Sequence, residues 1–462
     1  MELRTWQQEC IQRATSQYKS GQSHFLCLAT PGAGKTLMAS RLAKQLIDDN
    51  LIDLVICITP ALIVSEDFRA ELEIQLGKKL DGKLGSIGRT LTYHAMLNEN
   101  YIWDLFEYYK VFVIFDEIHH CAGNELHNSN AWGQKIISKI QGRATYTLAL
   151  TGTPWRSDNI PISLGQYSED GMVHCDYSYG LTQAIKDKVC RTPNITLFDN
   201  DNITLTESGA VSQFNSFDNL LRDSNCTYQS LIESESLIKY MLDKANKKLD
   251  LLREIDPDSG GLIVATSVSH AKSIHNLLKQ HLDEYADMVT YLEPDSVNSI
   301  KRYKLSKTKW IVSVGMISEG TNIPRLKICC YLTRVKTELY FRQVLGRILR
   351  ANGSDNELGY FYMPAEPALS EYSHRVSEDI PGENIVKFDT GPSIINTKSG
   401  TPLNLPPMSF KSAPFLELNE FEILTDNSTM EYSSKLSRGY EHTLGLLGQF
   451  KQTALNLGEL QS

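Results

Sequence analysis

Short apolar runs alternate with amphipathic stretches along the first 150 residues of the chain. The runs predict strands at 24–30, 54–60, 89–96, 111–117 and 145–152, and the stretches predict helices at 35–49 and 64–79. Residues 111–115 read VFVIF and are apolar at every position, as expected of a central strand covered on both faces. This alternation is typical of a parallel α/β sheet.

The same alternation restarts at residue 261. It predicts strands at 261–267, 288–293, 310–316, 327–332 and 358–364, with helices at 271–286, 299–307 and 338–350. Between the halves, 200–215 is polar and loop-like, and 228–255 is a charged helical stretch. We therefore expect an α/β protein with two tandem, doubly wound parallel-sheet domains, 1–205 and 206–370, and a nucleotide cleft between them.

Beyond Pro364 the alternation fades. Residues 371–462 are expected to form a small acidic C-terminal extension, with a turn-rich linker at 391–408 and a helix around 430–457. Residues 366–462 hold 13 Asp and Glu residues against 7 Lys and Arg, a net charge of −6. Such a segment is a poor ligand for nucleic acid. It is either a solvated appendage or a docking segment for a protein partner.

Composition is that of a globular protein, with 41% hydrophobic and 22% charged residues. The longest apolar run, 54–64, is interrupted by Thr59 and Pro60 and falls short of the ~20 residues that a membrane span needs. The first ten residues are polar and contain no signal-peptide core, so we expect a cytoplasmic protein that binds no membrane. The nine cysteines include no CxxC pair and are expected to be reduced thiols.

The net charge of −9 hides a local basic zone. Residues 301–350 hold twelve Lys and Arg residues against Glu319 and Glu338, a net charge of +10. A zone of this size has the charge that phosphate binding requires, although a solvated helix face is the alternative. Within it, Lys301, Arg302, Lys304, Lys307 and Lys309 are candidates for non-specific, salt-sensitive contacts with nucleic acid.

The stretch ATPGAGKT, 29–36, follows one predicted strand and opens a helix, which is the context of a phosphate-binding P-loop. Gly32 and Gly34 allow backbone N–H groups to turn inward around phosphate oxygens, and the helix N-terminus adds partial positive charge. Lys35 is expected to reach the β- and γ-phosphates, and Thr36 to bind Mg²⁺. The predicted cradle for ATP also contains Pro31 and Ala33.

A second polar cluster, FDEIHH at 115–120, follows the strand predicted at 111–117. Asp116 is suited to Mg²⁺ coordination and Glu117 to orienting the attacking water. A zinc site is the alternative interpretation, and Cys121 and His127 are the nearby additional ligands it could use. The P-loop upstream favours magnesium and ATP.

These segments together resemble a superfamily 2 helicase of the DExH type. ATPGAGKT resembles motif I, DEIHH motif II, TGTPWRSD (151–158) motif III, SEGTNIP (318–324) motif V and QVLGRILR (343–350) motif VI. Within the superfamily, the chain most resembles the group with restriction-enzyme motor subunits and phage-defence helicases, which implies two RecA-like domains. Ala29 replaces the first P-loop glycine, and Asn322 stands where motif V usually has Asp.

The resemblance implies a role for each matching residue. Arg4 and Gln7 would recognise adenine, and Gly320 would contact the nucleotide. Arg347 and Arg350 would approach the γ-phosphate from the second domain as catalytic residues. His119 would bond Gln343, and Thr151 and Thr153 would couple domain closure to nucleic acid. The residues that would contact the nucleic-acid strand, each equally explained as a loop cap, are Thr59, Thr92, Thr266 and Ser318.

The function that the resemblance implies is an ATP-dependent helicase or translocase that uses ATP and Mg²⁺. It would move along or remodel nucleic acid, DNA rather than RNA, in restriction or phage defence. The alternative is an ATP-switched regulatory or sensor subunit whose C-terminal extension docks an effector such as a nuclease. An intrinsic nuclease activity has little support, because no carboxylate–lysine constellation of that kind stands outside the motor motifs.

Overall fold

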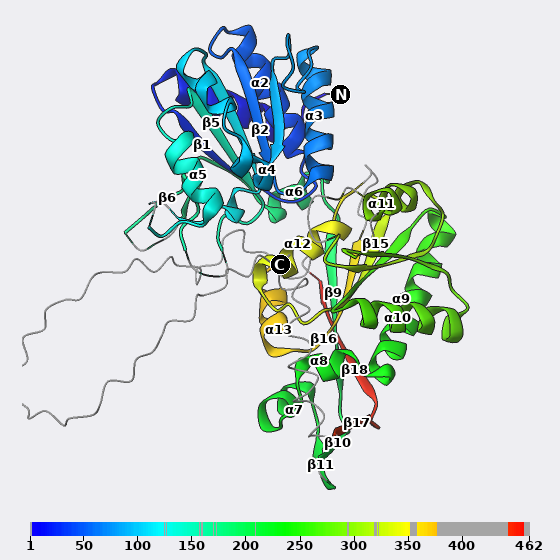
Figure 1. Ribbon diagram of the computed structural model, residues 1–462. Coiled ribbons are helices and arrows are strands. Elements are labelled where there is room, and N and C mark those ends of the chain that lie inside the picture. The colour runs from blue at the N-terminus through cyan, green and yellow to red at the C-terminus, as the bar shows by residue number, and fades with distance from the viewer. Residues whose placement is uncertain are drawn as a thin grey trace, which may run out of the picture.

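The computed structural model describes residues 2–123, 125, 127–156, 158, 160–169, 171, 173–207, 209–292, 295–317, 321, 323–351, 358–376 and 442–456. These residues form two α/β lobes with α12 (Glu338–Ile348) lying at their junction (Figure 1). A six-stranded sheet forms the centre of the first lobe and a seven-stranded sheet the centre of the second. The prediction of two tandem parallel-sheet domains is confirmed.

The six strands of the first sheet all pair in parallel. In spatial order they are β3 (Gly88–Thr92), β2 (Leu54–Thr59), β4 (Val111–Asp116), β5 (Tyr146–Thr151), β1 (His24–Ala29) and β8 (Tyr177–Tyr179). Because the carboxyl ends of parallel strands lie at one edge, the loops after β1, β4 and β5 meet there. These three loops carry the predicted motifs I, II and III.

Helices cover both faces of the first sheet, because the side chains of β4 are apolar on both faces and each face packs against its own set of helices. Phe112 and Ile114 belong to one hydrophobic cluster, whereas Val113 and Phe115 belong to another, as the two-residue period of a strand requires. The first cluster includes α1 (Thr5–Lys19), α2 (Lys35–Asp48) and α3 (Leu62–Leu76). The second includes α4 (Tyr93–Asn98), η1 (Ile102–Glu107) and α5 (Ala131–Lys139).

The second sheet has six parallel strands and one antiparallel edge strand. Its spatial order is β13 (Ala286–Thr290), β14 (Trp310–Val314), β12 (Gly260–Ala265), β15 (Leu326–Leu332), β16 (Leu358–Pro364), β9 (Thr192–Asn200) and β18 (Phe450–Asn456). Its helices are α8 (Tyr228–Ile232), α9 (Glu235–Ile255), α10 (Val268–Leu282), α11 (Ser296–Leu305), α12 and α13 (Pro367–His374).

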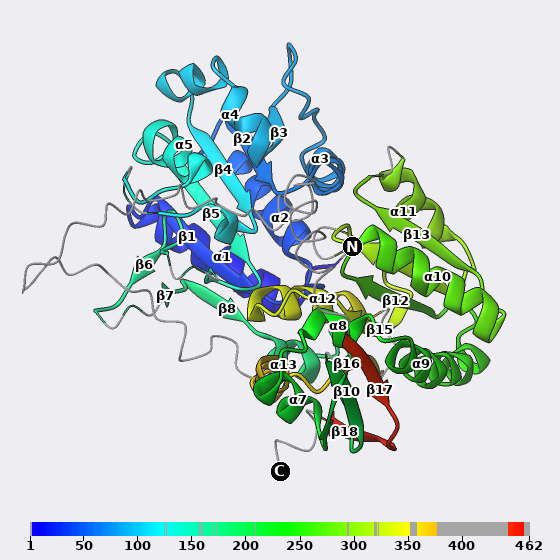
Figure 2. The same cartoon turned by 60° about the horizontal axis from the view of Figure 1, so that its bottom comes forward.

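Smaller elements complete the described chain. A three-stranded antiparallel sheet contains β10 (Ile203–Glu207), β11 (Ala210–Phe214) and β17 (His442–Leu446), and α7 (Phe217–Asp223) follows β11. Figure 2 shows β17 and β18 beside the second lobe. The remaining elements are η2 (Ile118–His120), β6 (Gln166–Tyr167), β7 (Val173–His174) and α6 (Leu181–Lys186).

Three sequence-based expectations need correction. The chain enters the second sheet at β9, so residues 192–200, assigned to the first domain by the predicted boundary at 205, belong to the second sheet. The stretch 200–215, expected to be a loop, contains the hairpin of β10 and β11. The helix expected around 430–457 is instead, over 442–456, the strand pair β17 and β18. The predicted linker at 391–408 lies outside the described residues.

No helix within the described ranges is long and apolar enough to cross a membrane. All nine cysteines are free, and eight of them are buried. The thiols of Cys10 on α1 and Cys27 on β1 lie 3.7 Å apart. Burial raises the pKa of several of these thiols, Cys57 and Cys329 among them, so they are protonated packing groups rather than nucleophiles.

Candidate active site at the domain junction

The P-loop connects β1 to α2 through two glycines in the left-handed region. Gly32 has φ 85° and Gly34 has φ 98°, values that residues with a side chain rarely adopt. A Cβ atom at Gly34 would lie 2.8 Å from Gln7 Nε2. Lys35 and Thr36 then begin α2, so the backbone N–H groups at this helix start are available to an anion.

Arg4 and Gln7 hold the P-loop from the start of α1. Arg4 Nη1 donates to the carbonyl oxygen of Ala33 at 2.6 Å, and Gln7 Nε2 donates to that of Gly34 at 2.9 Å. Gln7 Oε1 accepts from the backbone N–H of Arg4 at 2.9 Å. Both side chains therefore stabilise the loop conformation directly. Their contact with adenine stays a prediction. To bind adenine, the Gln7 amide would have to give up or share its hydrogen bonds with Arg4 and Gly34.

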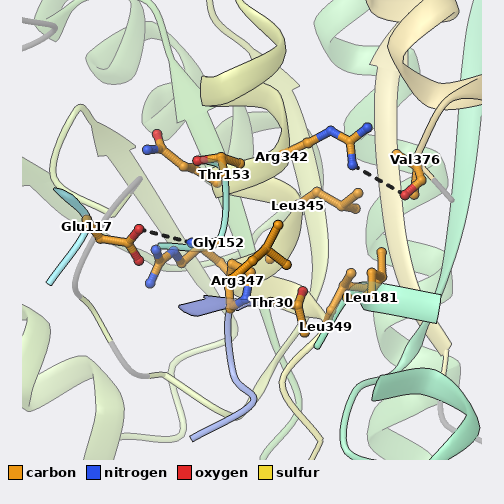
Figure 3. Close-up of a pocket in the computed structure, with 15 residues that line it drawn as sticks. Thr30, Glu117, Gly152, Thr153, Leu181, Arg342, Leu345, Arg347, Leu349 and Val376 are labelled. Carbon is orange, nitrogen blue, oxygen red and sulfur yellow. Dashed lines mark hydrogen bonds between the residues drawn. The ribbon is translucent and has the colours of Figure 1, made fainter. Parts of the chain in front are cut away.

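Lys35 and Glu117 form an ion pair within the site. Lys35 Nζ lies 2.6 Å from Glu117 Oε1, and both side chains are largely shielded from solvent. The backbone N–H of Gly152 lies 3.3 Å from Glu117 Oε2 (Figure 3). Glu117 has φ 50°, a conformation that costs about 1–3 kcal/mol for a residue other than glycine. The strain and both contacts aim the Glu117 carboxylate into the junction.

Asp116 and Thr36 offer the oxygen ligands that Mg²⁺ prefers. Asp116 ends β4 and is buried, and Thr36 is in the first turn of α2. Mg²⁺ in nucleotide sites keeps several waters and is held by one or two protein groups together with phosphate oxygens. One carboxylate and one hydroxyl fit this pattern. Among the described residues no group of three or more His, Cys, Asp or Glu side chains could hold a metal.

His119 bridges the two domains. Its Nδ1 lies 2.9 Å from Thr151 Oγ1, and its Nε2 lies 3.3 Å from Nε2 of Gln343 on α12. The Thr151 hydroxyl donates to the carbonyl oxygen of Thr153 at 2.9 Å. The Nδ1 atom also lies 3.5 Å from Glu117 Oε2, so His119 connects the DEIHH carboxylate with motif III and motif VI. The structure thus brings together His119, Thr151, Thr153 and Gln343, and their coupling role stays a prediction.

Two arginines of the second domain point toward the P-loop. Arg347 Nη1 donates to the carbonyl oxygen of Thr321 at 3.0 Å, and a Cβ added to Gly32 would lie 2.9 Å from Arg350 Cγ. Burial, followed by the charge of Arg347, lowers the pKa of Arg350 to about 9. Two guanidinium groups that repel one another in a buried place are stabilised by an anion, so the pair fits a phosphate group.

The space at the junction is narrow. A cavity of about 40 Å³ lies between Pro31, Glu117, Gly152, Gln343 and Arg347 (Figure 3). Ligand pockets are roughly 300–1,000 Å³ in volume, so this cavity admits water but no nucleotide. Gly346 of α12 packs directly on Pro31, because a Cβ at Gly346 would lie 2.7 Å from Pro31 Cβ. The two domains are therefore in close contact at this point.

A further contact between the domains was not foreseen in the sequence. The Arg342 guanidinium lies 5.5 Å from the ring centre of Trp155, which follows β5 in motif III. The same group donates to the carbonyl oxygens of Arg375 at 2.8 Å and Val376 at 3.4 Å. The sequence positions of the two residues could have indicated this contact. Arg342 directly precedes Gln343 of motif VI, and Trp155 follows Thr153 of motif III by two residues.

Three of the candidate strand-binding hydroxyls form hydrogen bonds with the backbone in this structure. Thr59 is fully buried and donates to the carbonyl oxygens of Ala61 and Leu91, at 3.3 and 3.4 Å. Thr92 accepts from the backbone N–H of Ala95 as the N-cap of α4. Thr266 is buried and accepts from the N–H of Arg334. The capping alternative therefore describes Thr92, and the contacts of all three residues with a nucleic-acid strand stay predictions.

Ser318 and Gly320 lie outside the described residues, as does Asn322. The basic zone at 301–350 is not one surface. Arg325 and Lys327 are buried, whereas Lys301 and Lys304 are exposed on α11. Lys301 Nζ lies 3.3 Å from Glu66 Oε2 on α3, so α11 faces an acidic helix of the first domain. Part of the zone therefore contributes to the contact between the domains.

The comparisons with known proteins agree with this geometry. Residues 1–156 match the family model described as ResIII, Type III restriction enzyme, res subunit. The matched segment, called the ResIII domain below after this model, covers about a third of the chain. It contains the P-loop, the DEIHH cluster and the TGTP sequence of motif III, and so contributes one side of the junction.

The ResIII domain and much of the following chain also have sequence relatives. Over 384 residues the chain is 30% identical to the uncharacterized protein ML1624 of Mycobacterium leprae (strain TN). It is 29% identical to the uncharacterized protein Rv2917 of Mycobacterium tuberculosis (strain ATCC 25618 / H37Rv). Each alignment covers 79% of this chain and 62% of the relative, so the chain spans about 62% of the length of these relatives.

Among solved structures, a fragment of an HsdR subunit of a type I restriction enzyme from Vibrio vulnificus YJ016 is similar to this chain. The TM-score is 0.55 at 15% sequence identity, and the match covers 82% of this chain and 67% of that one. Because the match extends beyond the ResIII domain, it shows that the fold is shared over most of the chain. At this identity the likeness concerns the fold alone.

Proposed function

We propose that this protein is a nucleic-acid-dependent ATPase that moves along or remodels DNA. One observation carries the proposal. Helix α12 of the second domain places Arg350 against Gly32 of the P-loop and Gln343 beside His119 of the DEIHH cluster. A phosphate site built from two domains connects hydrolysis to their relative motion, which is what a translocating enzyme requires.

Several side chains have a defined part in hydrolysis. Lys35 would leave Glu117 for the β- and γ-phosphates, since a triphosphate offers it a stronger charge. The Glu117 carboxylate, still held by the N–H of Gly152, would then orient the attacking water. Arg347 and Arg350 would stabilise the charge on the transferred phosphoryl group. Thr36 and Asp116 would hold Mg²⁺, which neutralises charge on the phosphate oxygens.

The proposal also names the polymer, which is DNA, and the biological process, which is restriction or another defence against foreign DNA. The family described for the ResIII domain is a subunit of a restriction enzyme, and the fold resembles that of an HsdR fragment. Both support DNA over RNA as the polymer, and a place in restriction or another defence against foreign DNA. The exposed lysines of α11, Lys301 and Lys304 among them, supply charge for non-specific phosphate contacts once the domains separate.

The test is the steady-state rate of ATP hydrolysis without polymer and with single-stranded DNA, duplex DNA or RNA. Glu117→Gln is the blank, because the amide has nearly the same shape but cannot accept a proton from water. We expect stimulation by DNA, and loss of hydrolysis by about 10²–10⁴-fold in Glu117→Gln. The Lys35→Ala variant should lose turnover as well. Undiminished hydrolysis in these variants would contradict the proposal.

A second candidate function has a specific observation in its favour. Arg342, next to Gln343 in motif VI, donates to the carbonyl oxygens of residues 375 and 376, from which the chain continues into the acidic extension. A partner bound to that extension could therefore act on the junction. ATP hydrolysis that is abolished in Glu117→Gln but stimulated by no polymer would favour this partner-controlled switch over the motor.

A further inference from the structure

Arg191 is a buried arginine in the segment that leads into β9. Its side chain is 1% exposed. The guanidinium donates to three backbone carbonyl oxygens: Nη1 lies 2.9 Å from Leu326 O and 3.1 Å from Ile348 O, and Nη2 lies 3.1 Å from Pro324 O. One side chain thus connects the segment leading into β9 with the start of β15 and the end of α12.

These three carbonyls belong to the parts of the second domain that present the site arginines. Ile348 is the last residue of α12, one position after Arg347 and two before Arg350. Pro324 closes the motif V segment, whose Thr321 carbonyl accepts from Arg347. Arg191 therefore holds both segments that determine where Arg347 lies.

The backbone beside Arg191 extends the same connection toward the P-loop. The N–H of Arg191 donates to the carbonyl oxygen of Leu349 at 2.7 Å, and Cys190 forms an antiparallel bridge with Arg350. The Cys190 thiol lies 3.6 Å from the carbonyl oxygen of Pro31. Cys190 thus contacts both the P-loop and Arg350, the arginine that packs on Gly32.

The chemistry suits an arginine at this place. A cation next to the last carbonyl of α12 is favoured by the helix dipole, and the rigid fork of a guanidinium can serve carbonyls in different directions at once. A lysine retains the charge but donates from a single point, so it cannot hold three separate carbonyls in the same geometry. The second domain contains a close counterpart, Arg325, which is also buried.

Arg325 has the same kind of bonding but a different location. It donates to the carbonyl oxygens of Asp258 at 2.7 Å, Tyr303 at 3.1 Å and Thr308 at 2.6 Å. None of these acceptors is in α12 or the P-loop. Arg325 stands between Pro324 and Leu326 in the sequence, but its side chain bonds other acceptors. Replacing it therefore removes a buried arginine bonded to three carbonyls while the bond from Arg191 to Ile348 on α12 stays.

We propose that Arg191 is a positioning residue that sets Arg347 and Arg350 against the P-loop. The inference rests on the proposed ATPase function. The bonds of Arg191 to Pro324, Leu326 and Ile348 reach the backbone of motif V, β15 and motif VI, and Arg191 acts through that backbone. Its loss should lower the rate of the chemical step, because small displacements of groups that stabilise a transition state cost up to about 10²-fold in rate.

The experiment compares Arg191→Lys with Arg325→Lys in the full chain, under the polymer condition that gives the highest turnover. We expect Arg191→Lys to lower kcat at least about tenfold, with KM for ATP and Kd for a fluorescent ATP analogue within about threefold of the parent values. Arg325→Lys should lower thermal stability to a similar degree and leave kcat within about twofold of the parent value. Equal losses of kcat in the two variants would overturn the proposal, as would an unchanged kcat in Arg191→Lys.

Hydrogen exchange supplies a readout independent of activity. In Arg191→Lys, peptides that cover 345–351 should exchange faster than in the parent, whereas peptides of the first domain should not change. Arg325→Lys should leave the segment 345–351 as it is. If Arg191→Lys does not fold, Arg191→Gln, which keeps planar N–H donors without the charge, takes its place in both arms. Absent hydrolysis in the parent chain would contradict the ATPase function, whereas unchanged exchange at 345–351 would overturn the role of Arg191.

Discussion

His24 shows how a single side chain can make the first domain sensitive to acid. It begins β1, the strand that leads into the P-loop, and its Nδ1 lies 2.7 Å from Thr147 Oγ1 on the neighbouring β5. Burial lowers the pKa of His24 to about 4, and the charge of Asp176 offsets only part of this effect. The ring is therefore neutral in the folded protein at neutral pH, whereas an unfolded chain takes up a proton near pH 6.5.

We predict that the first domain loses stability as the pH falls from about 6.5 to 4. In this window the unfolded chain binds the proton that folded His24 excludes, so unfolding is favoured, by about 2 kcal/mol at pH 5. Above pH 6.5 the contribution of His24 is fully present. Urea unfolding at pH 7.5 and pH 5 measures the change. His24→Gln should reduce the difference between the two pH values, and an identical difference in this variant would contradict the assignment.

For single residues, the sequence predicted some of the contacts at the junction and missed others. The approach of His119 to Gln343 and of Arg350 to the P-loop was expected from the motifs, and the structure contains both. The Lys35–Glu117 pair and the bonds of Arg4 and Gln7 to P-loop carbonyls were not expected. Motif spacing predicted which side chains gather at the junction, but it did not predict the bonds that they make there.

Helix α12 and the residues directly after it contribute the candidate site residues Gln343, Arg347 and Arg350. One glycine, Gly346, allows α12 to pack closely on the P-loop. Gly346 is buried against the P-loop, and a Cβ there would lie 2.7 Å from Cβ and 2.8 Å from Cγ of Pro31. Alanine is a better helix former than glycine by about 1 kcal/mol, so an alanine at this position would not weaken α12 itself. The clash would fall between the two domains.

We predict that Gly346→Ala lowers kcat for ATP at least about tenfold while the melting temperature stays the same or rises. The added methyl group should hold α12 away from the P-loop and displace Arg350 from Gly32. Gly445→Ala is a suitable control, because the Cβ it adds to β17 has no atom closer than 3.7 Å. Normal turnover in Gly346→Ala would show that close packing of α12 on Pro31 is not needed for hydrolysis.

Among the elements, the strands with continuous apolar runs were predictable and the strands at the edges were not. VFVIF became the central strand β4, fully buried on both faces. β9 was overlooked because Pro193 and Asn194 interrupt its pattern, and Pro in a run argues against a strand. The hairpin of β10 and β11 alternates apolar with Thr, Ser and Gln side chains, so composition alone resembled a loop. Non-local pairing with β17 stabilises it.

Over the whole molecule, the two domains meet through contacts of several kinds. Arg342 lies over Trp155, Gly346 packs on Pro31, and Lys301 pairs with Glu66 between α11 and α3. An exposed ion pair such as Lys301–Glu66 is worth only ~0–1 kcal/mol, so this last contact can be exchanged easily. The cavity that these contacts leave at the junction is only about 40 Å³, so the two domains lie close together there.

The most direct test of this account is the polymer-stimulated ATP turnover of the Arg350→Ala variant beside that of the parent chain, with binding of a fluorescent ATP analogue measured in both. If the site is built from two domains, Arg350→Ala should bind the nucleotide and lose roughly 10³-fold or more in kcat. Turnover equal to that of the parent would mean that the ResIII domain hydrolyses ATP without the second domain, which contradicts the composite site.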